Sequence, residues 1–368
     1  MRNFFKKIKF NIFLCLFKLK FFISKRFKDP CIICFDCLYD KNQEALDAFF
    51  LFEELQKKNI NSKYIALKKC ASFEILKDKK DVFFVNNRFD FFFKYANLIK
   101  NSSHIFTSFG LFCGLDEVLK ALKNIEYVFI EHGVTFLDTW LKDIYSFNKF
   151  DKILIPTKFT HKLYKKNSRF SEEKMIFAGL SRWNNFDIQF QKQIFVFFTW
   201  RKSFLNNKEF LADYFKSISI FLEKLCNIVP SEIKITFAWH HEALRRADIL
   251  PSLPKRIITL KPNEIYSAIQ KSSLLVSDFS SVFWDFIYQK KPVVFNRFDF
   301  YKNDLEEIDK KIFSEVMNLD SVFSNCFYDD KKALDKILYY IKNDFKCDIN
   351  YDFDEFFWDE NLVNVLNF

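Results

Sequence analysis

The residues whose chemistry stands out first are the hydroxyls and the carboxylate of Ser277-Asp278-Phe279-Ser280-Ser281. Residues 274–276 predict a short buried strand, and residues from Val282 onward predict a helix, because their apolar side chains recur at helical spacing. The first backbone N–H groups of a helix have no partner inside it, and the helix dipole places partial positive charge there. With the hydroxyls, such N–H groups can hold phosphate oxygens. The alternative is that Ser280 or Ser281 only caps the helix.

Short apolar runs and amphipathic segments alternate along the rest of the chain, and these elements would position the turn. Strands are predicted at residues 31–35, 64–67, 82–85, 104–107, 127–130 and 152–155, and then at 194–198, 233–239 and 257–259. Helices are predicted at residues 44–57, around His161, and at 210–226, 263–271 and 331–343. This alternation predicts the α/β class, with parallel sheets covered by helices. Ligands of such sheets bind outside the carboxyl ends of the strands, where Glu131-His132-Gly133 follows strand 127–130.

The chain has 368 residues, which is long enough for two domains of similar size. The pattern of strands and helices pauses at 179–185 and then restarts, so we expect two α/β domains with a cleft between them. The expected boundaries are 29–188 for the first domain and 189–345 for the second. The tail at 346–368 is acidic and aromatic in its middle, and it is expected to pack near the domain junction.

Residues 1–28 form a basic, aromatic-rich arm with nine Lys and Arg residues and no Asp or Glu. Its longest apolar stretch, residues 10–19, is too short to span a bilayer. No small-residue cleavage site follows, which disfavours a secretory signal. Such an arm suits the anionic inner face of a membrane, where each cation contributes about 1 kcal/mol. The alternatives are a solvated basic arm or an edge element of the first domain.

The net charge of +10 suggests an anionic surface or substrate as a partner, without choosing between them. The nine scattered cysteines fit reduced thiols in a cytosolic protein better than a disulfide framework. Cys31, Cys34 and Cys37 have a metal-like spacing, but they fall on a predicted buried strand whose alternate side chains point to opposite faces. Core packing is the favoured interpretation, and metal binding is the alternative.

Five short pieces stand in one order along the chain. They are Glu131-His132-Gly133, Gly179-Leu180-Ser181-Arg182, Thr199-Trp200-Arg201, Trp239-His240-His241, and the turn 277–281 followed by Asp285 and Lys291-Pro292. This series resembles the CDP-glycerol:poly(glycerophosphate) glycerophosphotransferase family, whose members build or prime teichoic-acid-like and capsular glycerol-phosphate chains. The likeness runs from about residue 31 to about residue 298.

The resemblance implies a GT-B-like pair of Rossmann-type domains facing across a cleft, with the donor on the second domain and the acceptor entering from the first. It implies transfer of glycerol phosphate from CDP-glycerol, or of a related CDP-alditol unit, to a hydroxyl of a lipid-linked or capsular glycan acceptor, with release of CMP. The reaction would take place in the cytoplasm, with the enzyme peripheral on the inner face of the membrane. No cofactor or metal is required, because arginines and N–H groups can neutralise the leaving group.

The family pattern also assigns roles to the histidines. His132 is expected to be the catalytic base, since its ordinary pKa near 6.5 lets it be neutral at cellular pH, and Gly133 is expected in the substrate site. A buried structural histidine is the alternative for His132. His240 corresponds to a second family histidine that contacts donor phosphate or helps the leaving group. His241 stands where the family usually has Pro, so the sequence leaves open which of the two rings acts.

The remaining expected ligands surround the donor. Arg182 and Arg201 can form forked bonds to phosphate oxygens, with surface salt bridging as the alternative. Asp285 matches a family aspartate that either bonds the donor or only caps and orients. Asp278 is expected to brace the turn rather than to react. The other residues assigned to substrate binding are Thr199, Ser277, Ser280 and Ser281.

Several other functions stay open at this stage. One alternative is a ribitolphosphotransferase that uses CDP-ribitol, and another is a GT-B glycosyltransferase that uses a nucleotide sugar. A non-catalytic protein that binds a membrane or nucleic acid is a different class. Nucleic-acid binding predicts basic residues spread over a groove, whereas here the basic excess lies before Asp29. We therefore expect no nucleic-acid partner.

Overall fold

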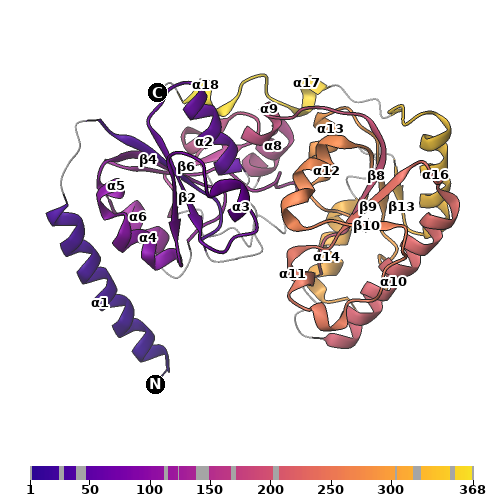
Figure 1. Ribbon diagram of the computed structural model, residues 1–368, viewed down its shortest axis with the longest axis horizontal. Coiled ribbons are helices and arrows are strands. Elements are labelled where there is room, and N and C mark those ends of the chain that lie inside the picture. The colour runs from indigo at the N-terminus through magenta and orange to yellow at the C-terminus, as the bar shows by residue number, and fades with distance from the viewer. Residues whose placement is uncertain are drawn as a thin grey trace.

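The computed structural model describes residues 2–24, 29–38, 47–111, 115–122, 124–137, 149–166, 171–201, 207–302, 305–317, 325–348 and 353–366. Side chains are described from residue 10 onward. Two parallel sheets with helices on their faces form two halves that lie side by side (Figure 1).

The first sheet has seven parallel strands within the described residues, in the order β3-β2-β1-β4-β5-β6-β7. The strands are β1 (Cys31–Phe35), β2 (Ser62–Leu67), β3 (Val82–Val85), β4 (Ser102–Thr107), β5 (Glu126–Phe129), β6 (Lys152–Ile155) and β7 (Met175–Phe177). In register, Cys34 lies opposite Tyr64 on β2 and opposite Phe106 on β4. The strands predicted from the apolar runs are all present, whereas β7 was not predicted.

The second sheet has six parallel strands within the described residues, in the order β10-β9-β8-β11-β12-β13. The strands are β8 (Gln191–Phe197), β9 (Lys234–Ala238), β10 (Ile257–Thr259), β11 (Ser272–Ser277), β12 (Val293–Asn296) and β13 (Cys326–Phe327). Both sheets therefore have the Rossmann order, which reverses between β1 and β4 in one half and between β8 and β11 in the other. The carboxyl ends of strands at such reversals are where this fold binds ligands.

Helices cover both sheets. In the first half they are α2 (Asp47–Lys57), α3 (Phe73–Leu76), α4 (Arg88–Lys94), α5 (Ala96–Lys100), α6 (Leu115–Lys120), α8 (Lys158–Lys166) and α9 (Ser181–Asn184). In the second half they are α10 (Lys208–Ile228), α11 (His241–Leu244), α12 (Ile265–Lys271), α13 (Phe283–Tyr288), α14 (Glu307–Met317) and α16 (Asp330–Lys342). The chain also contains short 3-10 turns, which include η5 (Pro262–Glu264), and it ends with α17 (Phe353–Phe356) and α18 (Leu362–Val365).

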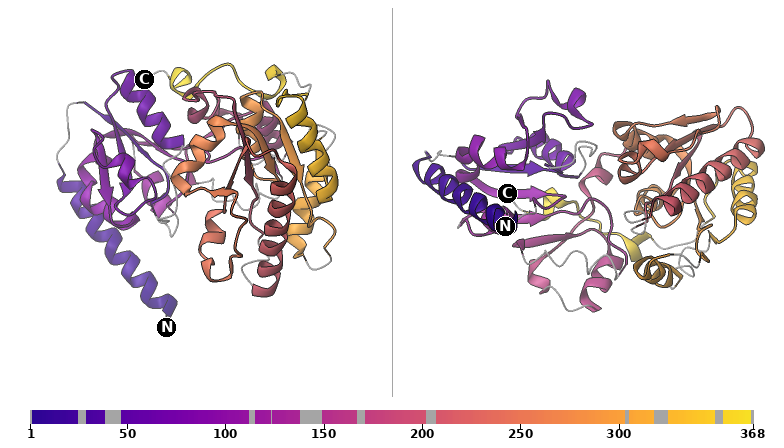
Figure 2. Two further views of the ribbon diagram at one scale, coloured as in Figure 1. Left: turned by 45° about the vertical axis from the view of Figure 1, so that its right-hand side comes forward. Right: turned by 90° about the horizontal axis from the view of Figure 1, so that it is seen from below.

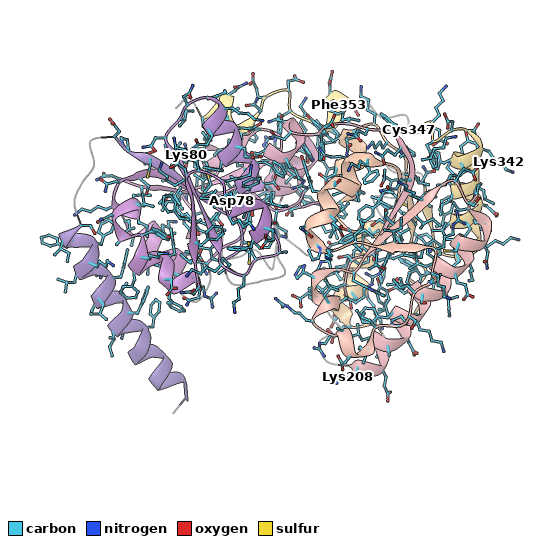
Figure 3. All side chains as sticks on the ribbon, viewed as in Figure 1. Asp78, Lys80, Lys208, Lys342, Cys347 and Phe353 are labelled. Atoms are coloured by element: carbon cyan, nitrogen blue, oxygen red, sulfur yellow. The ribbon has the colours of Figure 1, made fainter. Side chains whose placement is uncertain are left out.

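The hydrophobic core is continuous between the two halves. One cluster of buried side chains includes residues of β1 and α2 as well as residues of β8, β11 and α13. Phe136 of the first half packs edge-on against Phe283 of the second, with ring centroids 5.0 Å apart. Side chains fill the space between the ribbons in both halves (Figure 3). This shared core fixes how the two sheets face each other.

The described part of the C-terminal tail returns to the first half. Phe357 bridges to Thr157, and Asn361 bridges to Gly179. Phe357 also lies edge-on to Trp183 and Trp284, at centroid distances of 5.3 and 6.0 Å. The tail therefore contacts elements of both halves, while the domain boundaries given above remain a prediction.

The basic arm contains a long helix, α1 (Arg2–Ile23), which projects from the first half with its N-terminus at the free end (Figure 1; Figure 2). Phe13 and Phe17 are buried against Phe92 of α4, with centroids 5.6 and 4.9 Å away. Lys100 of α5 donates hydrogen bonds to the carbonyls of Phe22 and Ser24. None of the described helices is long and apolar enough to cross a bilayer.

Candidate active site

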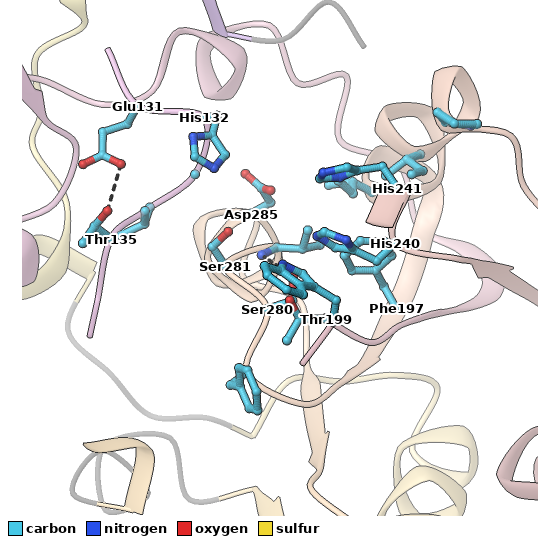
Figure 4. A pocket seen from close by; sticks show the side chains of 18 of the residues that line it. Glu131, His132, Thr135, Phe197, Thr199, His240, His241, Ser280, Ser281 and Asp285 are labelled. Carbon is cyan, nitrogen blue, oxygen red and sulfur yellow. Dashed lines mark hydrogen bonds between the residues drawn. The ribbon is translucent and has the colours of Figure 1, made fainter. Parts of the chain in front are cut away.

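A pocket of about 450 Å³ lies between the carboxyl ends of the two sheets. This volume is in the range of small-molecule sites. Residues from both halves line it, among them Phe109, Glu131, His132, Gly133, Thr135, Arg182, Thr199, Trp200, His240, His241, Tyr266, Ser280, Ser281, Asp285 and Asp309. Figure 4 shows His132 on one side of the pocket, His240 and His241 on the other, and the side chains of Ser280, Ser281 and Asp285 between them. The pocket therefore brings together the residues that the sequence motifs singled out from both halves.

His132 follows β5 and presents its ring to the pocket. Protein surrounds the ring, although more than a third of the residue stays open to the pocket. Burial, followed by the nearby His241 and Arg182, lowers the pKa of His132 to about 4. The nearby backbone of Ser108 acts in the opposite direction. A neutral ring has one nitrogen available to accept a proton.

Glu131, next to His132, is a pocket residue that the sequence analysis did not assign a role. Its backbone has a φ of 61°, the left-handed region that non-glycine residues rarely adopt. The buried carboxyl accepts hydrogen bonds from Thr135 Oγ1 at 2.9 Å and from Tyr164 Oη at 3.2 Å. Burial raises the pKa of Glu131 to about 8. With this backbone conformation, His132 points into the pocket while Glu131 points to Thr135 (Figure 4).

Gly133 of the first half lies close to Ser281 of the second. A Cβ atom at Gly133 would lie 2.5 Å from the Oγ of Ser281 and 3.3 Å from its Cβ. Real Cβ atoms do not come so close, so a side chain here would force the Ser281 side chain to shift. The glycine is therefore required by the close approach of the second half.

His240 and His241 begin α11 after β9. His240 Nδ1 accepts the backbone N–H of Glu242 at 3.3 Å, so the side chain caps the helix. When this ring is neutral, its proton is therefore on Nε2. Burial, with His241 and His132 nearby, holds the pKa of His240 well below its ordinary value. The ring of His241 lies 4.3 Å from that of His240, and its Nε2 is 3.4 Å from a carboxylate oxygen of Glu242.

The turn after β11 divides its predicted ligands into two groups. Ser280 and Ser281 line the pocket, whereas Ser277 and Asp278 are fully buried and do not. Ser277 Oγ donates to the carbonyl of Phe197 at 2.6 Å. In the described part of the chain, no group accepts a hydrogen bond from the backbone N–H of Ser280 or Ser281. These two N–H groups and two hydroxyls are therefore the phosphate donors that this turn offers.

Asp278 and Arg201 brace the turn instead of facing the pocket. Asp278 accepts hydrogen bonds from the backbone N–H of Thr199 at 3.0 Å and from Arg201 at 2.8 Å. Arg201 is 0% exposed, makes two further bonds to Asp299 at 2.8 and 2.9 Å, and lies over the ring of Phe279. We expected Arg201 to hold phosphate, but its guanidinium is enclosed by two carboxylates. The bracing role expected for Asp278 agrees with these bonds.

Arg182 connects the two halves. It donates from Nε to Asp285 at 2.9 Å and from a terminal nitrogen to Asp47 of α2. Trp183 Nε1 also donates to Asp285, at 2.6 Å. Burial raises the pKa of Asp47 to about 7, although the nearby Arg182 acts against that shift. Arg182 and Asp285 line the pocket, but they form ion pairs mainly with each other, and Arg182 also pairs with Asp47. The structure therefore favours the orienting role for Asp285.

Three other expectations can be placed. Thr199 lines the pocket directly after β8, and its N–H is held by Asp278. Cys31 and Cys34 are buried in β1, and Cys37 is buried just after the strand ends, as core packing predicts. Among the described residues, no group of three or more His, Cys, Asp or Glu side chains is arranged to hold a metal ion.

The sequence did not predict the buried carboxylates that bind the elements carrying the pocket residues, namely Asp36, Asp47 and Asp299. Asp36 follows β1 and binds the backbone N–H groups of Ala48 and Phe49 at the start of α2, each at 3.2 Å. It also accepts bonds from Tyr64 and Ser108. Its position after a predicted strand was the available signal, because carboxyl ends of parallel strands carry ligand-side residues. Asp47 and Asp299 gave no such signal, since their partners are far away in sequence.

Comparisons with known proteins agree with this geometry. A family model described as CDP-Glycerol:Poly(glycerophosphate) glycerophosphotransferase matches residues 18–346. The minor teichoic acid biosynthesis protein GgaB of Bacillus subtilis (strain 168) is 25% identical, over 65% of this chain and 28% of that protein. The chain thus spans well under half the length of this relative.

Solved structures show the same fold. The wall teichoic acid polymerase TagF aligns with a TM-score of 0.58 at 17% identity, over 93% of this chain and 96% of that chain. A UDP-GlcNAc 2-epimerase from Neisseria meningitidis aligns with a TM-score of 0.52 at 13% identity, over 89% and 95% of the two chains. The expected GT-B-like pair of Rossmann-type domains is confirmed.

Proposed function

Because the chain belongs to the CDP-glycerol:poly(glycerophosphate) glycerophosphotransferase family, we propose that it transfers glycerol phosphate from CDP-glycerol to an acceptor hydroxyl and releases CMP. The observation that carries the proposal is the pocket in which His132 of one half faces His240 and the Ser280–Ser281 turn of the other. A base on one side and phosphate donors on the other are what attack of a hydroxyl on a pyrophosphate needs. Teichoic acid biosynthesis by the relative GgaB supports a cell-surface polymer as the product.

His132 takes the proton from the acceptor hydroxyl as its oxygen attacks the β-phosphorus. The ring is neutral at cellular pH because its pKa lies well below its ordinary value. The negative charge of a bound donor raises that pKa again, toward the range in which a base works efficiently. The ring of Phe109, stacked on the imidazole with centroids 4.2 Å apart, keeps the ring oriented during the transfer.

The second half binds the pyrophosphate and stabilises the leaving group. The N–H and hydroxyl groups of Ser280 and Ser281 bind phosphate oxygens, and His240 Nε2 donates a hydrogen bond to the charge that grows on CMP. Arg182 and Arg201 do not bind the phosphates directly, because carboxylates pair with both of them. They support the residues that do. Thr199 and His241 complete the donor side.

The acceptor is proposed to be a lipid-linked or capsular glycan at the inner face of the cell membrane, with the enzyme bound peripherally. The outer face of α1 supports this location. Ile12, Leu16 and Leu19 expose 56%, 51% and 59% of their surface, and Lys18 and Lys20 beside them are also exposed. An apolar stripe flanked by cations is typical of a helix that lies in the interface of an anionic membrane.

The direct test measures CMP release by the purified protein with CDP-glycerol, CDP-ribitol or a nucleotide sugar, in the presence of a membrane or glycan extract. We expect CMP release from CDP-glycerol that persists with a chelator and is lost in His132→Ala. A preference for CDP-ribitol would change the alditol but not the reaction. Release of a nucleoside diphosphate from a nucleotide sugar, with no CMP from either alditol donor, would overturn the proposal in favour of a glycosyltransferase.

A further inference from the structure

Three neighbouring strands of the first sheet send residues to the same point behind His132. Strand order places β1, β4 and β5 side by side, so their carboxyl ends are adjacent. Asp36 follows β1, Ser108 and Phe109 follow β4, and His132 follows β5. Segments far apart in the sequence therefore meet around one imidazole ring.

The contacts within this group form a chain. The ring of Phe109 stacks on the ring of His132, with centroids 4.2 Å apart and planes 25° apart. The backbone of Ser108 lies near the same imidazole and favours its charged form. The Ser108 hydroxyl donates in turn to Asp36, which is buried and also bound by Tyr64 at 2.8 Å. One face of the ring is thus covered by Phe109, and the residue before it, Ser108, is anchored to Asp36.

We propose that Thr107 to Phe109 is a clamp that positions the His132 ring, with Phe109 covering one face and Asp36 anchoring Ser108. Phe109 is a positioning residue, because it acts on the reaction through the base. Its own backbone is fixed, since its N–H donates to Thr107 Oγ1 at 3.1 Å. The catalytic consequence rests on the proposed role of His132 as base, whereas the effect on the ring itself does not.

The clamp acts on the ring by excluding water and by fixing its plane. A histidine with one face against an aromatic ring is less hydrated, which disfavours the charged form. The other groups that face His132 are His240 and His241 at the start of α11, Arg182 of α9 and Asp285 of α13 across the pocket, with Glu131 beside it in the chain. These stay in place when only Phe109 is changed.

The test compares Phe109→Leu, Phe109→Tyr and the control Phe73→Leu. Phe73 is also half-buried and packs edge-on against Phe84 at 5.0 Å, but it does not line the pocket. The chain has five histidines, so selective ¹³C labelling resolves them, and His132→Gln assigns the signal of His132. We expect Phe109→Leu to move the titration midpoint of His132 upward by about one pH unit or more. Phe109→Tyr and Phe73→Leu should leave it unchanged.

Activity gives the second measurement. In Phe109→Leu, the apparent pKa on the acid side of the kcat–pH profile for CMP release should rise together with the titration midpoint of His132. At the same time, kcat should fall about 10-fold or more while KM for CDP-glycerol changes little. A His132 titration in Phe109→Leu that matches the unchanged protein would overturn the clamp. Absence of CMP release from every protein tested would contradict the proposed function, and the titration would still decide the clamp.

Discussion

His240 and His241 are adjacent, yet their rings are held differently, and this difference predicts which one acts. His240 Nδ1 caps α11, which leaves its Nε2–H as a donor. Replacing His240 by Asn should keep the cap, because Asn is among the preferred N-cap residues, but it removes the Nε2 donor. We expect the thermal midpoint to change little and kcat for CMP release to fall about 100-fold or more.

His241→Ala is the matched comparison, since its ring lies beside that of His240 and lines the same pocket. We expect less than about a 10-fold fall in kcat, because His241 is one of several donor-side groups. The opposite order of effects, with His241→Ala the more damaging, would assign the leaving-group role to His241.

Glu131 makes stability depend on pH. Its pKa rises from an ordinary 4.5 to about 8 in the folded protein, so the folded state binds an extra proton between those values. The sign follows from linkage: its contribution is fully present below pH 4.5 and is lost as pH rises toward 8. Burial raises the pKa of Asp47 to about 7, so its contribution to stability is lost as pH rises toward 7.

Glu131→Gln removes this dependence and leaves an amide that can still bond Thr135. We expect the free energy of unfolding of the variant minus that of the unchanged protein to grow between pH 7 and 8, by up to about 1.4 kcal/mol per pH unit. Urea unfolding at several pH values measures this difference. A difference that stays constant across the window would show that Glu131 is already ionised in the folded protein.

At the scale of elements, the sequence predicted most of the sheet framework because parallel strands are continuous apolar runs. β1, β3, β6 and β10 begin and end where the pattern placed them. β7, β12 and β13 were missed. β13 has only two residues, which is too short to show a pattern. The turn 277–281 was predicted in place, but the burial of Asp278 and Arg201 was not. That burial depends on Asp299, whose side chain is brought to Arg201 only by the fold.

The cluster of Arg201, Asp278 and Asp299 holds the loop after β8 against the turn after β11. Arg201→Met leaves two buried carboxylates without their cation, which costs about 3–5 kcal/mol in similar cases. We expect a loss of unfolding free energy of this size in urea, together with weaker donor binding because the turn shifts. Lys63→Met, which removes a half-buried ion pair with Asp81, should cost about 1 kcal/mol or less. Equal losses in the two variants would show that the cluster does not brace the turn.

For the whole molecule, the pocket depends on how closely the halves approach. Gly133→Ala places a Cβ 2.5 Å from Ser281 Oγ, so we expect overpacking to destabilise the protein by about 1–3 kcal/mol. Ser281→Ala removes that oxygen and leaves only a Cβ contact at 3.3 Å. The double variant should therefore be more stable than Gly133→Ala alone, as measured by thermal or urea unfolding in a double-mutant cycle. If the losses of unfolding free energy in the two single variants simply add, the two halves can move apart at this point at little cost.

The exposed face of α1 predicts that the whole molecule attaches to a membrane. Ile12, Leu16, Leu19 and Ile23 are spaced four, three and four residues apart, so they form one exposed stripe. Phe13 and Phe17 pack on the body, so α1 presents this stripe as part of a fixed surface. Apolar side chains would enter the acyl boundary while lysines meet anionic headgroups.

Leu16→Glu places a charge in the stripe, and we expect binding to vesicles with anionic lipid to fall about 10-fold or more in a sedimentation assay. Binding by the unchanged protein should weaken with added salt, because its cationic part is screened. Ile75→Glu is the control, since Ile75 is also 51% exposed but lies on α3. CMP release onto a soluble acceptor should survive in both variants, because α1 is remote from the pocket. Equal vesicle binding by both variants would show that the stripe does not contact the membrane, and α1 would then be only an edge element of the first half.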